Sequence, residues 1–320
     1  MRSRRRAHGC GEWVDSGIEG NTIVTANGRF QGPTYRHAGT DAAPYETIEV
    51  RKLTPVIGAE VGGIDLSRPM VEAQFAELSR ALAENQVVFF RDQDLTLDQH
   101  DAFGRLFGDL HVHPAAPSAP GHPGMMLIHA DKDSPRADGE GWHTDVSCDP
   151  IPPMGSILYI RTCPPLGGDT LFASMYAAYE SLSAGMKTYL DGLSAQHTGD
   201  YRGAYAHHGV SDKDIANPTA VHPVVRVHPM TGRKCLYVNK GFTKRILGVP
   251  RDESEGVLNM LFEHAANPLF QCRFQWRENS IAFWDNRCVQ HRAMWDYWPA
   301  TRSGYRVTVR GEKPVGVGAV

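Results

Sequence analysis

The segment Gly141-Trp142-His143-Thr144-Asp145-Val146 places an imidazole and a carboxylate two residues apart, between an aromatic and a β-branched residue. On an extended strand, residues i and i+2 project from the same face, so His143 and Asp145 can approach one point. A non-haem iron site uses two histidines and one carboxylate and leaves the opposite coordination positions open. The segment therefore predicts a strand that supplies two of the three ligands.

A histidine two residues before an acid is a short motif that also occurs by chance. His129 and Asp131 form a second such pair, which we interpret as an ordinary polar pair at a strand end. We expect His291, which follows Trp284-Asp285-Asn286-Arg287 at the edge of a strand, to be the third ligand. The alternative for His291 is a loop or core histidine without a metal.

The last strand, at about residues 303–310, alternates two kinds of side chain. Arg302, Gly304, Arg306 and Thr308 share one face, whereas Tyr305, Val307 and Val309 take the other. If helices cover the apolar face, two guanidiniums point into the interior, where a charge needs an anion beside it. The pattern predicts two bound carboxylate- or sulfonate-like groups. The alternative is a structural cluster in which Arg302 and Arg306 pair with Asp285 or Glu278.

The rest of the chain shows many short β-rich runs with helical segments between them. Strands are predicted at residues 48–53, 86–90, 155–161, 223–227, 235–238, 270–276 and 281–284. Helices are predicted at 71–85, from 97 onward behind a Thr96–Gln99 capping box, at 174–194 and at 252–266. The inner face of the second helix should hold Phe103, Leu106 and Phe107. Loops are predicted at 114–123, 131–141 and 196–220. This pattern predicts a mainly β fold with flanking helices and a helical insertion, not a parallel α/β sheet.

Charge and composition exclude several classes of protein. The net charge of −3 gives no basic surface for nucleic acid, and no apolar run is long enough to span a membrane. Six scattered cysteines suit reduced thiols in the cytoplasm better than a disulfide framework. The arginine-rich start lacks a following apolar region, so secretion is not expected. Residues 1–46 are predicted to be a flexible arm before a domain at 47–320.

Over about residues 48 to 314 the chain resembles the taurine/2,4-D dioxygenase family of Fe(II)- and 2-oxoglutarate-dependent oxygenases. The matching signature is His143-x-Asp145, Thr170 after a Gly-Gly-Asp turn, His291, and Arg302 after ten intervening residues. The stretches PVIGAEVGGIDLSRP, QVVFFRDQ, WHTDV, GGDTLFAS, HPVVRVHP and WDNRCVQHRA are also similar to the family.

The resemblance implies a double-stranded β-helix, or jelly-roll, in which His143, Asp145 and His291 bind Fe(II). Three protein ligands leave three positions, two for 2-oxoglutarate and one for O₂. The distal carboxylate of 2-oxoglutarate is expected on Arg302, with the Thr170 hydroxyl beside it. The reaction would hydroxylate a small molecule and release succinate and CO₂. Because Asp145 is present, a halogenase is disfavoured. By analogy with relatives we also expect a homo-oligomer.

The resemblance further implies that His113 and Arg306 bind the anionic group of the substrate. Taurine-hydroxylating relatives use a Tyr, an Asn and a Ser around the amine, and those positions here are Ala116, Gly139 and Ala204. We also expect substrate contact at Val146. A site without these polar groups should discriminate weakly for an amine. We therefore expect a sulfonate, a sulfate ester or a carboxylate such as an aryloxyalkanoate, with a bulkier and less polar tail than that of taurine.

Two other kinds of protein would fit parts of the pattern. A catalytically silent jelly-roll could bind a small acid as a sensor or carrier. A zinc hydrolase could use the same three ligands, but it would have no role for Arg302. His207 and His208 lie in a polar loop and could face a substrate or a second subunit, and we assign them no metal role.

Overall fold

The computed structural model describes residues 43–201, 203 and 217–318. Most of the predicted arm at 1–46 lies outside the described residues, so a domain boundary at residue 47 stays a prediction. None of the helices in the described part of the chain is long and apolar enough to cross a membrane.

Eight strands form the main sheet, in the order β1–β2–β3–β14–β6–β16–β5–β4. They are β1 (Glu49–Lys52), β2 (Ala59–Gly62), β3 (Val87–Phe90), β14 (Ser280–Asp285), β6 (Gly155–Thr162), β16 (Arg302–Val309), β5 (His122–Ala130) and β4 (Ser118–Ala119). Neighbouring strands are antiparallel except β2 and β3, which are parallel. The strands that meet in the centre, β14, β6 and β16, come from distant parts of the sequence.

Three smaller sheets and five helices complete the described fold. A second sheet contains β13 (Gln271–Phe274), β7 (Thr170–Ser174) and β15 (Val289–Ala293). The others are β12 (Thr243–Ile246), β8 (Ser194–Thr198) and β9 (Thr219–Pro223), and the pair β10 (Val225–Val227) and β11 (Lys234–Leu236). The helices are α1 (Glu72–Asn85), α2 (Leu97–Arg105), α3 (Met175–Glu180), α4 (Ala184–Leu190) and α6 (Arg251–Ala265), with a short 3₁₀ turn at Pro268–Phe270.

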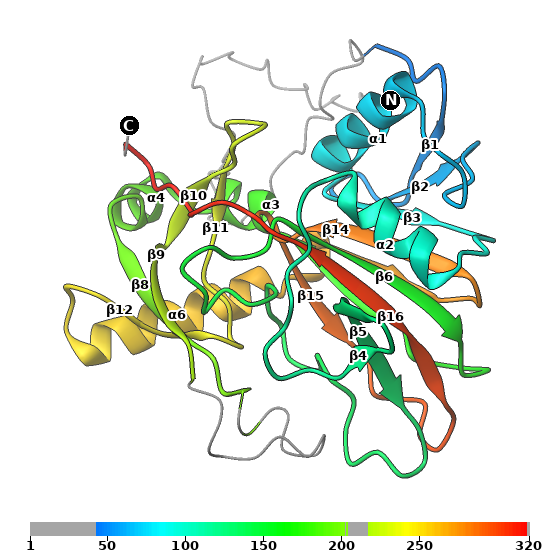
Figure 1. Ribbon diagram of the computed structural model, residues 1–320. Coiled ribbons are helices and arrows are strands. Elements are labelled where there is room, and N and C mark those ends of the chain that lie inside the picture. The colour runs from blue at the N-terminus through cyan, green and yellow to red at the C-terminus, as the bar shows by residue number, and fades with distance from the viewer. Residues whose placement is uncertain (1–42, 202, 204–216, 319–320) are drawn as a thin grey trace, which may run out of the picture. The chain divides into compact units, whose positions relative to one another are not determined.

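The main sheet separates two apolar cores, because successive side chains of its strands point to opposite faces. On one face Val307 of β16 and Tyr159 of β6 pack with Phe103 of α2, and α1 and α2 cover this side (Figure 1). On the other face Leu158 of β6 and Trp284 of β14 share a core with the second sheet. Two mainly antiparallel sheets with a core between them are the architecture of a jelly-roll.

The core between the main sheet and the helices α1 and α2 confirms the alternation predicted for the last strand. Val307 and Val309 are fully buried among the helices, while Arg302, Gly304 and Thr308 are buried on the opposite face. A Cβ on Gly304 would lie 2.1 Å from the carbonyl oxygen of Tyr159, so only glycine allows β6 to approach here.

Most predicted elements are confirmed, but four details outside the candidate site are wrong. Residues 174–194 form two helices, because Ser183 starts α4 as its N-cap by accepting a hydrogen bond from the Met186 amide. The first residues of the predicted loop at 196–220 belong to strand β8. The strand was not predicted because the polar residue His197 occupies a buried position, so the apolar alternation is incomplete. The predicted loop at 114–123 contains strand β4 and the start of β5. Leu106 is exposed, since α2 ends at Arg105, whereas Phe103 faces the core.

Two buried histidines should make the fold sensitive to acid. Burial lowers the pKa of His100 from 6.5 to about 4 and that of His197 from 6.5 to about 3. Below pH 6.5 these two histidines become protonated in the unfolded chain. In the folded chain they stay neutral until the pH approaches 4 for His100 and 3 for His197. The free energy of unfolding should therefore fall by about 1.4 kcal/mol per pH unit per group in this window. Urea denaturation at a series of pH values measures the slope, and His100→Gln should reduce it.

Candidate active site

His143 and His291 are held side by side by a single antiparallel bridge between distant segments. The His143 amide donates to the His291 carbonyl at 3.1 Å, and the His291 amide donates to the His143 carbonyl at 2.9 Å. The two rings lie 4.2 Å apart between centroids. His291 belongs to β15, but the strand predicted around His143 is only this isolated bridge. A turn begins at Asp145, and Val146 has a φ of 50°, a strained value for a β-branched residue.

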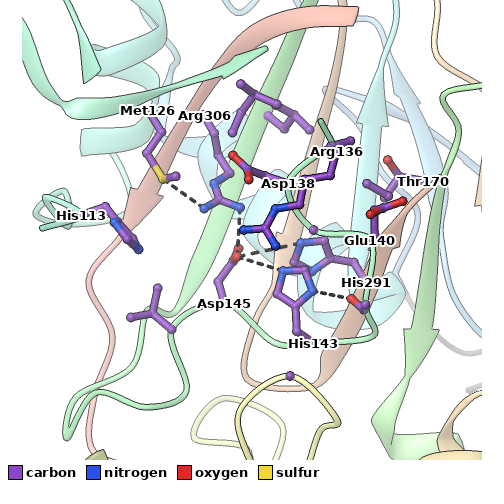
Figure 2. A pocket seen from close by; sticks show the side chains of 18 of the residues that line it. His113, Met126, Arg136, Asp138, Glu140, His143, Asp145, Thr170, His291 and Arg306 are labelled. Carbon is purple, nitrogen blue, oxygen red and sulfur yellow. Dashed lines mark hydrogen bonds and ion pairs between the residues drawn. The ribbon is translucent and has the colours of Figure 1, made fainter. Parts of the chain in front are cut away.

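Asp145 completes a group of three possible metal ligands. Its Oδ1 lies 3.6 Å from His143 Nε2 and 3.9 Å from His291 Nε2, and the ligand atoms all lie within 4.8 Å of one another (Figure 2). The Nδ1–H of His143 donates to the Gly141 carbonyl at 2.7 Å, which leaves Nε2 as the atom with a free lone pair. The structure thus brings together the three residues that the sequence selected.

The Asp145 carboxylate is ionised although it is buried. Burial by itself would raise its pKa, but the guanidinium of Arg306 and the two imidazoles hold the pKa well below its usual range. Arg306 Nη1 lies 2.9 Å from Asp145 Oδ1, and the Ser156 hydroxyl donates to Oδ2 at 2.7 Å. An ionised carboxylate between two imidazoles is a donor set that suits a divalent transition metal. The residues present therefore fit iron.

A second group, His228, Asp285 and Cys288, also brings possible ligand atoms together. Here the carboxylate is already used: Arg287 donates to both oxygens of Asp285, at 2.8 and 2.7 Å, and His228 Nε2 lies 3.0 Å from Oδ2. Burial raises the pKa of the Cys288 thiol well above its usual value, which disfavours the thiolate that binds metals. This group is a satisfied polar network.

The same contacts decide the alternative raised for the two arginines of β16. Asp285 pairs with Arg287, and no ion pair joins Glu278 to Arg302 or Arg306 among the residues that the structure describes. Arg306 pairs instead with Asp145, a partner that the sequence did not indicate. Arg302 is buried and lines the cavity described below, where its guanidinium can bind an anion.

Arg302 is a buried cation that forms no ion pair with an acid among the residues that the structure describes. It is 5% exposed, its Nε has no hydrogen-bond partner, and its guanidinium lies over the Trp276 ring at 5.3 Å. Its Nη2 donates to the Thr170 hydroxyl at 3.5 Å. Burial lowers the pKa of Arg302, so the site would gain from an anion. Arg302 and Thr170 therefore offer a cation and a hydroxyl that suit a carboxylate group.

One cavity of about 410 Å³ connects these groups. Its wall includes the three candidate ligands, Thr170, Arg302 and Arg306, together with His113 and Met126. In the view of Figure 2, Thr170 and His113 lie on opposite sides of the three ligands. The cavity thus has room for an anion beside Arg302 and for another group beside Arg306 and His113.

The residues predicted to contact the substrate have different placements. His113, Gly139, Val146 and Arg306 line the cavity. Ala116 is not among the described residues of its wall, although its amide donates to His113 Nδ1 at 3.0 Å. Gly139 has a φ of +84°, which favours glycine, and a Cβ there would lie 3.4 Å from His143 Cε1. Ala204, His207 and His208 lie outside the described residues.

Sequence reasoning did not single out Ser156 or Asn286, although both contact Asp145. Ser156 lies two residues before Leu158 on β6, so it shares the inner face with that cavity residue. The alternation along β6 could have indicated that Ser156 faces the interior. Only the fold shows that Asp145 is its partner there. Phe242 and Tyr201 also line the cavity, but they belong to no sequence motif that could have identified them.

A jelly-roll that gathers two imidazoles, a carboxylate and a buried arginine in one cavity defines an Fe(II)- and 2-oxoglutarate-dependent dioxygenase. The chain belongs to the taurine catabolism dioxygenase TauD, TfdA family, whose model matches residues 49–308. The protein therefore uses iron(II), 2-oxoglutarate and O₂.

Individual relatives agree with this assignment. An alpha-ketoglutarate-dependent sulfonate dioxygenase of Saccharomyces cerevisiae is 34% identical over 84% of this chain and 68% of its own length. An alkylsulfatase of Acinetobacter baylyi is 35% identical over 85% of this chain and 88% of its own. The crystal structure of a taurine dioxygenase from Burkholderia xenovorans superposes with a TM-score of 0.76 at 40% identity, covering 86% of this chain and 93% of that one. The predicted jelly-roll is thereby confirmed.

Proposed function

We propose that His143, Asp145 and His291 bind Fe(II) and that Arg302, with Thr170, binds the distal carboxylate of 2-oxoglutarate. The observation that supports this most is the buried Arg302 guanidinium, which shares a cavity with the three ligands and forms no ion pair within the described part of the chain. Bound iron, with 2-oxoglutarate and O₂, supplies the oxidising chemistry that converts a C–H bond into C–OH and releases succinate and CO₂. The chain's own residues hold the reactants and exclude water.

We propose that the substrate is an alkyl sulfonate or alkyl sulfate ester whose anionic group binds Arg306 and His113. Burial and the neighbouring Arg306 lower the pKa of His113 to about 3, so its imidazole is neutral at physiological pH. The Ala115 and Ala116 amides donate to its Nδ1 at 3.2 and 3.0 Å. Its proton must therefore sit on Nε2, which becomes a hydrogen-bond donor suited to an anionic oxygen.

Apolar side chains near His113 support the proposal of a less polar tail. Ala115, Val146, Cys148 and Tyr201 form a small buried cluster against which Phe242 packs. The His113 ring lies 4.8 Å from the Tyr201 ring. Residue 139 is a glycine, so the amide that taurine-hydroxylating relatives carry at this position is lacking. An alkyl chain suits these walls better than an ammonium group.

Hydroxylation of the carbon that bears the sulfonate would give an unstable product. An α-hydroxysulfonate collapses to an aldehyde and sulfite, and an α-hydroxyalkyl sulfate collapses to an aldehyde and sulfate. Each turnover should therefore release one succinate and one inorganic sulfur anion, which can be counted separately.

A substrate series tests this proposal. We expect kcat/KM for hexanesulfonate or hexyl sulfate to exceed that for taurine by about 10-fold or more, because each buried methylene contributes about 0.8 kcal/mol. Initial rates of succinate release, with sulfite or sulfate as second readout, measure the ratio. An aryloxyalkanoate in the same series tests a carboxylate head group. Clear preference for taurine would overturn the proposed tail, and preference for the aryloxy acid would overturn the proposed head group.

We also propose that the protein acts in the cytoplasm and forms a homo-oligomer. Cys148, Cys163, Cys235, Cys272 and Cys288 are free thiols, which supports a reducing compartment. The oligomer rests on analogy with relatives alone. Light scattering coupled to size-exclusion chromatography measures the assembly, and a monomer would contradict the proposal.

A further inference from the structure

The two oxygens of the Asp145 carboxylate have different surroundings. Oδ1 faces His143 Nε2 and His291 Nε2 at 3.6 and 3.9 Å, and it also accepts from Arg306 at 2.9 Å. Oδ2 accepts a hydrogen bond from the Ser156 hydroxyl at 2.7 Å. Both oxygens are thus held by the protein, Oδ1 by Arg306 and Oδ2 by Ser156, but the contacts with the two imidazoles are made by Oδ1.

The direction of the hydrogen bond from Ser156 is determined by its neighbours. The indole N–H of Trp284 can only donate, and it donates to Asn286 Oδ1 at 2.9 Å. The Asn286 amide must then present its NH₂ group to Ser156, 3.0 Å away. Because the Ser156 oxygen accepts this bond, its own proton is left for Asp145 Oδ2.

This chain of hydrogen bonds is anchored in the rigid centre of the main sheet. Ser156 is fully buried on β6, where its Cα is paired with Trp284 of β14 and Thr308 of β16. The Asn286 amide nitrogen of the backbone donates to the Met154 carbonyl at 2.8 Å. The Asp145 backbone N–H also points at Asn286 Oδ1, at 3.4 Å. The backbones of Ser156 and Asn286 are thus held by their pairing with neighbouring segments.

We propose that Ser156, oriented by Asn286 and Trp284, is a positioning residue that makes Asp145 bind the metal through Oδ1 alone. The inference rests on the proposed iron site. Two imidazoles and one oxygen occupy three positions and leave three open. A carboxylate that bound through both oxygens would take a position that 2-oxoglutarate or O₂ needs. Ser156 would therefore protect the open side of the site.

The decisive variant is Ser156→Ala, with Ser280→Ala as matched control. Ser280 is an equally buried serine of the same sheet, but its hydroxyl accepts from Arg91 and lies outside the site. Removing a residue that orients a metal ligand typically weakens metal binding or activity roughly 10- to 100-fold. We expect a loss of this size in Mn(II) affinity for Ser156→Ala, measured by calorimetry, and no comparable loss for Ser280→Ala.

A second readout separates positioning from stability. In the absence of oxygen, Fe(II) and 2-oxoglutarate should give the wild-type protein a charge-transfer absorption band. Ser156→Ala should weaken and shift this band and should raise the ratio of succinate to hydroxylated product. Asn286→Asp, which cannot donate to Ser156 when ionised, should act in the same direction. If Ser156→Ala is folded and matches Ser280→Ala in metal affinity, band and product ratio, the inference is wrong. If the wild-type protein itself forms no band, the proposed iron site fails instead.

Discussion

Replacing Asp145 by alanine is expected to abolish 2-oxoglutarate-dependent turnover. The variant loses the one carboxylate of the three candidate ligands and leaves the positive charge of Arg306 beside two imidazoles. A bound metal is worth several kcal/mol to the reaction, so kcat/KM should fall by about 10³-fold or more. Succinate release measures the rate, and equilibrium dialysis with Mn(II) should show loss of the bound metal.

The chain contains its own control for this experiment. His129 and Asp131 have the same spacing as His143 and Asp145, but they form a partly exposed pair at the end of β5, 3.3 Å apart. Asp131→Ala should therefore keep metal binding and turnover close to those of the wild type. Equal losses in Asp131→Ala and Asp145→Ala would contradict the assignment of the iron site.

Replacing Arg302 by methionine is expected to raise KM for 2-oxoglutarate far more than it changes metal binding. Methionine keeps an unbranched side chain of similar length but removes the charge and the donors. Losing one partner of a buried, hydrogen-bonded charge pair costs about 2 to 5 kcal/mol, which is roughly a 30- to 5000-fold change in affinity. Steady-state rates over a wide range of 2-oxoglutarate concentration measure this change, and activity should return at high concentration.

Arg310 supplies the matched control, because it follows directly on β16 but is exposed. Arg310→Met should leave KM for 2-oxoglutarate unchanged. The pair of variants also separates the other classes of protein that the sequence allowed. A zinc hydrolase with the same ligands would keep its activity in Arg302→Met, and a silent binding protein would release no succinate in any variant.

Local periodicity was sufficient to predict much of the site. The alternation along residues 302–309 placed Arg302 on the inner face, and the structure confirms its burial opposite Val307. The spacing of His143 and Asp145 predicted that both side chains could reach one point, although the segment is a bridge and a turn. The first prediction succeeded because the direction of a side chain in a strand depends on the conformation of its own few residues. The second reached the right result although the predicted strand is absent at Asp145, where a turn begins, so the contacts of the fold and not the strand geometry bring these groups together.

Contacts between distant segments could not be predicted in this way. No local pattern indicated that Arg306 would contact Asp145, 161 residues away, or that Ser156 and Asn286, 130 residues apart, would share a hydrogen bond. It also could not distinguish the two His-x-Asp pairs by spacing alone. These features depend on which strands become neighbours in the sheet.

The amino-acid sequence by itself therefore determined the chemical groups of the site, the face of the last strand on which Arg302 and Arg306 lie, and the family that the chain resembles. The tertiary structure decided which of those groups meet, how the Asp145 carboxylate is oriented, and that Arg306 rather than Arg302 pairs with it. The physical reason is that a side chain's direction is a local property of the backbone. Its partners and its burial arise only when β6, β14 and β16 pack together in the order that the complete fold imposes.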